Sequence, residues 1–206
     1  MKRPACRLFV VRATGGTVAA IFRRGPSAWT QVIRWDMSTD DFVDGAWFRG
    51  RIYAERCDVS PDGQLLVTFC HQGRKLGTSY RDSWTAVSRL PWLTALALWP
   101  AGTTYGGGGR WVGPRTLVLR NGLAERPHPD HLPRGLTVVA GAAPLHASAS
   151  TVVGADWSGV DHRGRTIYSL EGRLYRAAKG ADRELADFAD RQPDPTPAPP
   201  SARRPL

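Results

Sequence analysis

The sequence predicts an all-β fold of about four repeated units, each of about 50 residues. Short β-rich runs follow one another along most of the chain, clusters of Gly, Pro, Asp and Ser separate them, and helical periodicity is confined to one segment near the C-terminus. Many short strands with turn residues between them are typical of β-meanders, sandwiches and propellers. In chain order, the expected strands are Arg7–Val11, Thr17–Arg23, Trp29–Trp35, Arg51–Cys57, Gln64–Cys70, Trp84–Arg89, Leu93–Trp99, Arg115–Arg120, Thr151–Trp157, Arg165–Leu170 and Arg173–Ala177.

A turn followed by a β-rich run recurs four times. The element reads GGTVAAIF at 15–22, DGQLLVTF at 62–69, GPRTLVLR at 113–120 and RGRTIYSL at 163–170. Its second residue is Gly16, Gly63, Pro114 or Gly164, so successive elements lie 47, 51 and 50 residues apart. A period in this range matches the four-strand blade of a β-propeller. Because one hairpin cannot bury both of its faces, we expect neighbouring units to stack against each other.

One of these elements carries a family resemblance. SPDGQLLVTF at 60–69 resembles the blade signature of β-propeller proteins of the WD-repeat type and their relatives, in which Ser-Pro-Asp-Gly joins the first two strands of a blade, and DHRGRTIYSLEGRLYR at 161–176 is a weaker match. The resemblance implies a small β-propeller-like domain: a minimal ring, an open fragment, or half of a ring that is completed by self-association with a second copy. On the residues alone, a two-sheet β-sandwich is the alternative.

The C-terminal end is expected to differ from the repeated domain, which covers residues 1–183. The segment ADRELADFADR at 181–191 places Leu185 and Phe188 on one side of a short helix, so residues 184–191 are predicted to be a helical end of the domain. Residues 192–206 include six prolines and little apolar material. This last segment is therefore predicted to be a Pro-rich disordered tail.

The chain is strongly basic. Its 28 Lys and Arg outnumber 18 Asp and Glu, which gives a formal charge of +10 and a pI near 10.4. Only three of these cations are lysines and the longest cationic runs are pairs, so the pattern favours a dispersed basic surface over a nucleic-acid groove. Three Cys without a CxxC pair, no stretch of 18 apolar residues and no signal-peptide core together predict a cytoplasmic protein without a membrane span or disulfide framework.

Two long loops are expected on the same face of the molecule. Residues 71–83 and 121–135 each follow the second strand of a unit, and between them they contain three of the five histidines. Functional residues concentrate on long loops over a rigid scaffold. His128, Asp130 and His131 are of the types that bind a divalent metal, but their spacing around a proline favours a solvated turn. Neither a metal nor a cofactor is therefore predicted.

Tryptophan and arginine are interleaved in the middle of the chain. Trp84, Trp92, Trp99 and Trp111 fall among several arginines, and both residue types are enriched at binding hot spots. Most of these tryptophans are expected to fill space between units, which leaves Trp84 and Trp111 at loop edges. The candidate binding residues are Arg81, Trp84, Trp111, Arg110, His71, His128 and His131.

The leading functional hypothesis is a non-enzymatic protein-binding or scaffold module that presents loops 71–83 and 121–135 to a protein partner. No GxSxG motif and no Ser-His-Asp spacing is present. The glycine run at 106–109 lacks the Lys and the following helix of a phosphate loop, so a flexible hairpin loop is predicted there. The alternatives are a hydrolase or lyase that uses His71, Asp82, His128 and His131, and nucleic-acid binding through arginine.

Overall fold

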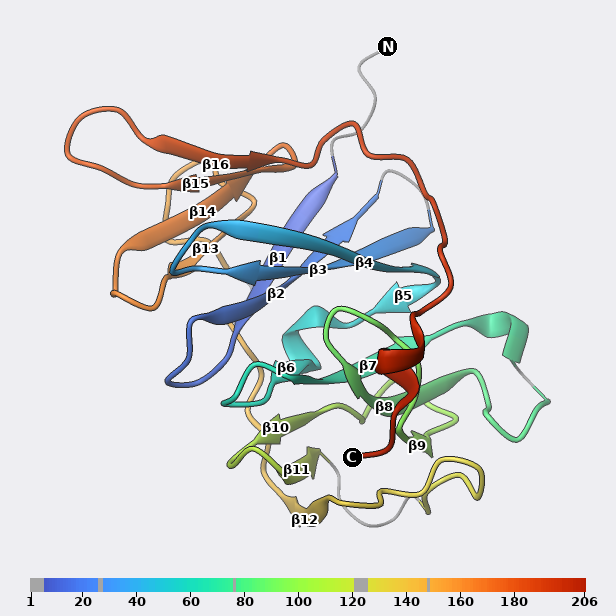
Figure 1. The fold of residues 1–206 in the computed structure, drawn as a ribbon. Helices are drawn as coiled ribbons and strands as arrows, with labels where there is room; N and C mark the ends of the chain where they lie inside the picture. The colour runs from blue at the N-terminus through green and yellow to red at the C-terminus, as the bar shows by residue number, and fades with distance from the viewer. Residues whose placement is uncertain (1–5, 26–27, 76, 121–125, 148) are drawn as a thin grey trace.

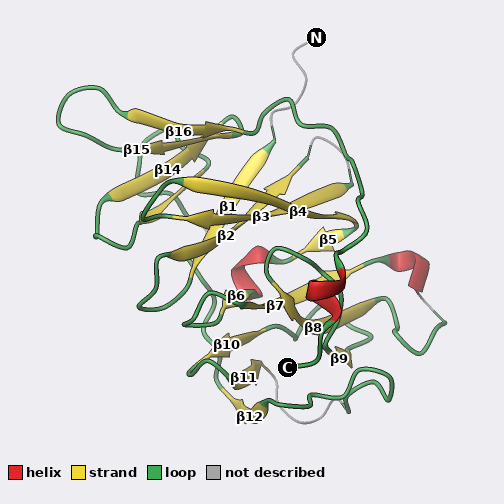
Figure 2. Ribbon diagram, in the orientation of Figure 1, coloured by secondary structure: helices red, strands yellow, loops and turns green. Residues whose placement is uncertain are grey.

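The computed structural model describes residues 6–25, 28–75, 77–120, 126–147 and 149–206. Within these ranges sixteen strands form four sheets, and the helices are single 3-10 turns (Figure 2). These turns are η1 (Ala54–Arg56), η2 (Gly73–Lys75) and η4 (Pro200–Arg203). The all-β class is thus confirmed. No helix in the described ranges has the length and apolar character needed to cross a membrane.

Each sheet is made of strands that are close together in the chain (Figure 1). Sheet A is an antiparallel meander of β1 (Arg7–Arg12), β2 (Val18–Arg24), β3 (Trp29–Asp36) and β4 (Asp41–Arg49). Sheet B contains β5 (Arg51–Ile52), β6 (Asp58–Val59), β7 (Leu65–His71), β8 (Ser83–Arg89) and β9 (Ala97–Pro100). Sheet C contains β10 (Gly109–Trp111), β11 (Thr116–Arg120) and β12 (Thr137–Gly141), and its last pair is parallel. Sheet D is a meander of β13 (Trp157–Val160), β14 (Thr166–Leu170), β15 (Arg173–Arg176) and β16 (Arg183–Asp187).

The sheets pack face to face in the spatial order D, A, B, C. Strand β2 is buried on both faces, which explains the continuous apolar run at residues 18–22: Ala20 and Phe22 enter the core shared with sheet B, whereas Ala19 and Ile21 enter the core shared with sheet D. A third core joins sheets B and C. Successive side chains of a strand point to opposite faces, so a sheet buried on both faces needs a continuous apolar run. With four sheets in series, the two-sheet sandwich alternative is wrong.

The four sheets form an open arc in the described part of the chain. No hydrophobic core there joins sheet C to sheet D, and the described residues between β12 and β13, 142–147 and 149–156, run across the molecule (Figure 1). One early strand of each sheet lies at the inside of this arc, where β1 packs against β6 and β13, and β6 packs against β10. The residues between these strands are therefore surrounded by several sheets at once.

A tight turn joins two antiparallel strands at every one of the four predicted positions: β1 to β2, β6 to β7, β10 to β11 and β13 to β14. In the Ser-Pro-Asp-Gly turn, the Gly63 N–H donates to Ser60 O at 2.8 Å, the Leu65 N–H donates to Ser60 Oγ at 2.8 Å, and Ser60 Oγ lies 2.5 Å from Asp62 Oδ1. Gly63 has φ +70°, a region that favours glycine. The turn elements were predictable because these interactions are local in sequence.

The segment expected to be a C-terminal helix is strand β16 instead. It pairs with β15, and Arg173 Nε lies 2.8 Å from Asp187 Oδ2 across the pair, while Tyr175 donates to Glu184 at 3.2 Å. Leu185 packs against the core between sheets A and D, and Phe188 is buried within it. A short isolated helix is only marginally stable, so the free edge of β15 and these cross-strand pairs decide the conformation.

The tail, for which the sequence predicts disorder, lies against the domain. The buried Arg23 donates to the carbonyl oxygens of Phe188 at 2.7 Å and of Ala189 and Arg191 at 2.9 Å. Further along, Ala202 is 2 % exposed and Leu206 packs against the core between sheets B and C. The prolines therefore lie in an extended strap held at both ends by contacts from distant parts of the chain, which composition alone does not reveal.

Candidate functional site

The two loops that were expected to share a face do meet. The Tyr80 ring, from loop 71–83, stacks on the His128 imidazole with centroids 4.2 Å apart and planes 10° apart. Its hydroxyl lies 3.4 Å from His131 Nε2. Residues 121–125 of the second loop lie outside the described residues. The stacked Tyr80 and His128 rings therefore join the 71–83 loop to residues 126–135.

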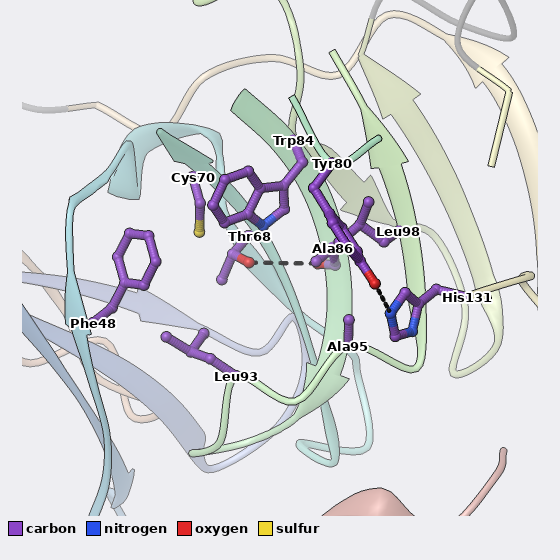
Figure 3. Close-up of a pocket in the computed structure, with 10 residues that line it drawn as sticks. All are labelled: Phe48, Thr68, Cys70, Tyr80, Trp84, Ala86, Leu93, Ala95, Leu98 and His131. Atoms are coloured by element: carbon purple, nitrogen blue, oxygen red, sulfur yellow. Dashed lines mark hydrogen bonds between the residues drawn. The ribbon is translucent and has the colours of Figure 1, made fainter. Parts of the chain in front are cut away.

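A pocket of about 250 Å³ opens beside this stack, and we call it the Tyr80 pocket (Figure 3). Strands β7 and β8 supply one wall, because Cys70 lies opposite Trp84 and Thr68 lies opposite Ala86 in their register. Residues directly opposite in an antiparallel pair project on the same face of the sheet. The remaining lining residues come from β4, the loop 71–83, the segment between β8 and β9, strand β9 and the second loop. They are Phe48, Tyr80, Leu93, Ala95, Leu98 and His131.

The interior of the Tyr80 pocket is apolar and aromatic. Trp84 meets Phe48 edge to face, with ring centroids 6.0 Å apart. Burial raises the pKa of Cys70 to about 12, so its thiol stays protonated and is a poor nucleophile. The polar groups at the rim are the Tyr80 hydroxyl and the His131 imidazole. Such a pocket suits an apolar group that also offers one hydrogen-bonding partner.

Next to Tyr80, the side chains of Ser79, His128 and Asp130 form a row in space. His128 is 4 % exposed, its Nε2 lies 2.9 Å from Ser79 Oγ, and its Nδ1 lies 3.8 Å from Asp130 Oδ2. The backbone N–H of Asp130 also donates to Nδ1 at 3.3 Å. Since Nδ1 accepts this bond, the proton of the neutral ring is on Nε2, and His128 donates to Ser79. A catalytic base must instead accept the serine proton through that nitrogen.

This geometry predicts the tautomer of His128. We expect nitrogen-15 NMR of the histidine side chains to show neutral His128 as the Nε2–H form. Because the Asp130 backbone sets the tautomer, Ser79→Ala should leave it unchanged, and Ser79 should not react with a fluorophosphonate probe. A neutral Nδ1–H form together with labelling of Ser79 would instead favour the hydrolase alternative.

The other residues proposed for that enzyme are not gathered around one point. His71 Nε2 lies 3.8 Å from Asp82 Oδ2 at the C-terminal end of β7, and neither lines the Tyr80 pocket. Arg81 has φ +57° and its Nη1 donates to Ala101 O at 3.4 Å, so it supports the neighbouring loop. No group of three His, Cys, Asp or Glu side chains in the described ranges is placed to hold a metal, and this includes His128, Asp130 and His131.

Arg110 and Trp111 belong to a different part of the molecule. Trp111 is 5 % exposed, its backbone N–H donates to Asp58 Oδ2 at 2.8 Å, and its indole N–H donates to Asp58 O at 3.3 Å. Arg110 Nη1 lies 3.3 Å from Asp58 Oδ1. The expectation that Trp111 stands at an exposed loop edge is therefore wrong. The buried Asp58 carboxylate holds it in place where sheets B and C meet.

Sequence reasoning found Trp84 and His131 but missed the residues that complete the site. Tyr80 carries no motif, and Phe48 lies on β4, a strand that was not predicted. The stacked His128 was predictable only as a loop residue, since its burial depends on a partner 48 positions away in the chain. Comparison of the chain with protein-family models, curated proteins and solved structures finds no match.

Proposed function

We propose that this chain is a non-enzymatic protein-binding module of β-propeller type, and that the Tyr80 pocket receives an apolar side chain from a partner protein. The observation that supports the proposal is an aromatic pocket lying where the two long loops meet, with a protonated thiol in its wall and a His128 that donates to Ser79 rather than accepting its proton. Its volume of about 250 Å³ is below the usual range of small-molecule sites, roughly 300–1,000 Å³, so a single anchoring side chain fits better than a cofactor.

The propeller-like part of the proposal has its own support. Each sheet follows the previous one in the chain, and one strand of each sheet, β1, β6, β10 or β13, lies on the inside of the arc, as the inner strands of blades do. The four inner hairpin turns recur at the spacing of a four-strand blade. An arc of this kind leaves its connecting loops at the ends of the strands, where loops 71–83 and 126–135 meet.

A protein partner is favoured over nucleic acid because of what lines the pocket. No Arg or Lys is among the described lining residues of the Tyr80 pocket. A site for single-stranded nucleic acid would combine stacking aromatics with cations that contact phosphates. Aromatic pockets with a polar rim are typical of hot spots in protein–protein interfaces.

The test is to fill the pocket without disturbing the fold. Ala95 lies at its edge and outside the strands, so Ala95→Trp should occupy it, while Val112→Trp adds the same ring at a site that is 65 % exposed in the β10–β11 turn. Displayed peptides selected on the unmodified chain should share an apolar anchor residue. We expect their affinity for the Ala95→Trp variant to fall about tenfold or more, and to be unchanged for Val112→Trp.

Two outcomes would contradict the proposal. If peptides from the selection bind both tryptophan variants and the unmodified chain equally well, or if no peptide is enriched, the Tyr80 pocket is not a protein-binding site. Thermal unfolding of the two variants is the control, because both must remain folded for the comparison of affinities to apply.

A further inference from the structure

A second cavity, of about 280 Å³, lies among the inner strands, away from the Tyr80 pocket. Its polar wall is formed by Arg12 at the end of β1, Arg110 of β10 and His146 of the segment between β12 and β13. Three sheets therefore contribute to one cavity, although these residues are far apart in sequence. None of them lies in the face assigned to protein binding.

Both arginines at this cavity are held in place by the protein. Arg12 Nη1 donates to the backbone oxygen of Asp161 at 2.8 Å, and Arg110 Nη1 lies 3.3 Å from Asp58 Oδ1. Among the described residues, all hydrogen bonds of these two guanidinium groups use Nη1. Their remaining N–H groups are left for a ligand, and little side-chain entropy would be lost on binding.

The charges around the cavity are unequally compensated. Asp161 is fully buried and is neutralised by Arg165 at 2.8 Å and Arg176 at 3.1 Å. Arg12 contacts only the carbonyl oxygen of Asp161 and forms no ion pair within the described ranges. The Asp58 carboxylate, 1 % exposed, lies behind Arg110 rather than in the cavity wall. The wall is thus cationic, which favours a negatively charged oxygen group.

His146 lies beside Arg110 and contacts its guanidinium group. Its backbone N–H donates to Glu55 O at 2.9 Å, which holds His146 against the η1 turn. Its imidazole contacts Arg110 Nη1, and Nε2 lies 3.5 Å from Asp58 Oδ1. The ring is therefore positioned beside the Arg110 guanidinium on the same wall of the cavity.

The opposite wall is apolar. Val10 and Ile167 are buried in the core between sheets A and D, and Trp157 is 6 % exposed beside them. A ligand that satisfies both walls needs an anionic group at one end and an apolar body at the other. Free inorganic anions satisfy only the first requirement, and neutral apolar molecules only the second.

We propose that this cavity binds a small organic acid, with its carboxylate or phosphate oxygens between Arg12 and Arg110 and its apolar body against Val10, Ile167 and Trp157. Guanidinium groups bind either anion through paired N–H donors. The cavity volume of about 280 Å³ is also below the usual range of small-molecule sites, so the ligand is limited to roughly the size of one ring with one acidic group, smaller than a cofactor.

The test uses benzoate, phenyl phosphate, inorganic phosphate and the neutral benzamide, titrated into the intact chain by calorimetry. We expect at least one of the two acids, benzoate or phenyl phosphate, to bind. The neutral benzamide should bind at least about tenfold more weakly than that acid. Arg12→Gln should weaken binding about tenfold, while Arg24→Gln, an exposed arginine on β2 outside this cavity, should not.

NMR of the methyl groups gives a measurement that needs no variant. Val10 and Ile167 methyl resonances should shift when the bound acid is added to the unmodified chain. The proposal is overturned if neither acid binds, if inorganic phosphate binds as tightly as phenyl phosphate and benzoate does not bind, if Arg24→Gln weakens binding as much as Arg12→Gln, or if these methyl resonances do not move.

Discussion

Replacing Gly107 by alanine is expected to destabilise the fold by about 3–4 kcal/mol, the sum of an overpacking cost and a backbone cost. A Cβ at this position would lie 2.1 Å from the ring of Phe69, and Gly107 has φ +89°. Phe69 is fully buried and packs against Tyr53 with ring centroids 5.3 Å apart, so its ring has no space to retreat. The steric cost therefore adds to the cost of a left-handed residue other than glycine.

Chemical denaturation of the unmodified chain and two variants checks this expectation. Gly15→Ala is the matched control, because Gly15 has φ +76° but no atom within 4 Å of the added Cβ. It should cost only about 1 kcal/mol, from the backbone alone. Equal losses for Gly107→Ala and Gly15→Ala would mean that the glycine run is loosely packed against Phe69.

The same contact corrects the interpretation of the glycine run as a flexible hairpin loop. Arg56 Nη1 donates to Thr104 O at 2.7 Å and to Gly106 O at 2.8 Å, and the Gly108 N–H donates to Thr85 Oγ1 at 2.8 Å. A Cβ on Gly108 would lie 2.3 Å from Arg56 O. Glycine is needed here because the backbone passes directly against other parts of the chain, a requirement that the sequence alone cannot distinguish from flexibility.

Local and distant interactions explain which parts of the fold were predictable. Strands β2 and β7 are apolar runs next to turns with their own hydrogen bonds, so the sequence predicts both. Strand β4 was missed because Asp44, Gly45 and Ala46 interrupt its apolar residues and because it pairs only with β3. Strand β16 was taken for a helix because its partner is the edge of β15. Propensity is a weak guide wherever a sheet edge supplies the hydrogen bonds.

In the candidate site, too, the features set by local sequence were predictable and those set by distant contacts were not. The position of loops 71–83 and 121–135 after the second strands of their units predicts that they share a face, and Trp84 and His131 do line one pocket. The pocket itself depends on Tyr80 stacking on His128 and on Phe48 from another sheet. These are tertiary contacts between residues that no spacing rule connects, so the residue types could be predicted but their assembly could not.

Replacing Arg176 by methionine is the second change with a large expected effect, a loss of about 3 kcal/mol at neutral pH. Arg176 Nη1 and Nη2 donate to the two carboxylate oxygens of Asp40 at 2.9 and 2.8 Å, and Nε donates to Asp161 at 3.1 Å. This arginine, which is 6 % exposed, links sheet D to the β3–β4 turn of sheet A. Methionine preserves much of the packing volume but leaves the Asp40 and Asp161 carboxylates without this partner.

The pH dependence identifies the source of that loss. The hydrogen bond from Arg176 lowers the pKa of Asp40. For Asp161, burial is the largest influence and raises the pKa, but the backbone N–H groups of Arg165 and Arg163 and the Arg165 side chain outweigh it, so its pKa is also lowered. Folded-state pKa values below the unfolded value of about 3.9 mean that the stabilisation is complete above about pH 5 and is lost as the pH falls through 4 toward the lowered values.

The difference in unfolding free energy between the unmodified chain and Arg176→Met should therefore be largest near pH 7 and should narrow below about pH 4. Urea denaturation at pH 7 and pH 3 measures both values. Arg183→Met is the matched control: its guanidinium lies 3.8 Å from the same Asp40 but its side chain is 69 % exposed, so solvent screening leaves it with about 0–1 kcal/mol. If the difference in unfolding free energy for Arg176→Met is the same at pH 7 and pH 3, the loss comes from packing of the side chain. If this free-energy difference narrows at pH 3 and Arg183→Met costs no more than about 1 kcal/mol, the loss in Arg176→Met comes from the ionised Asp40 and Asp161. An ion network would then join the last sheet to the first.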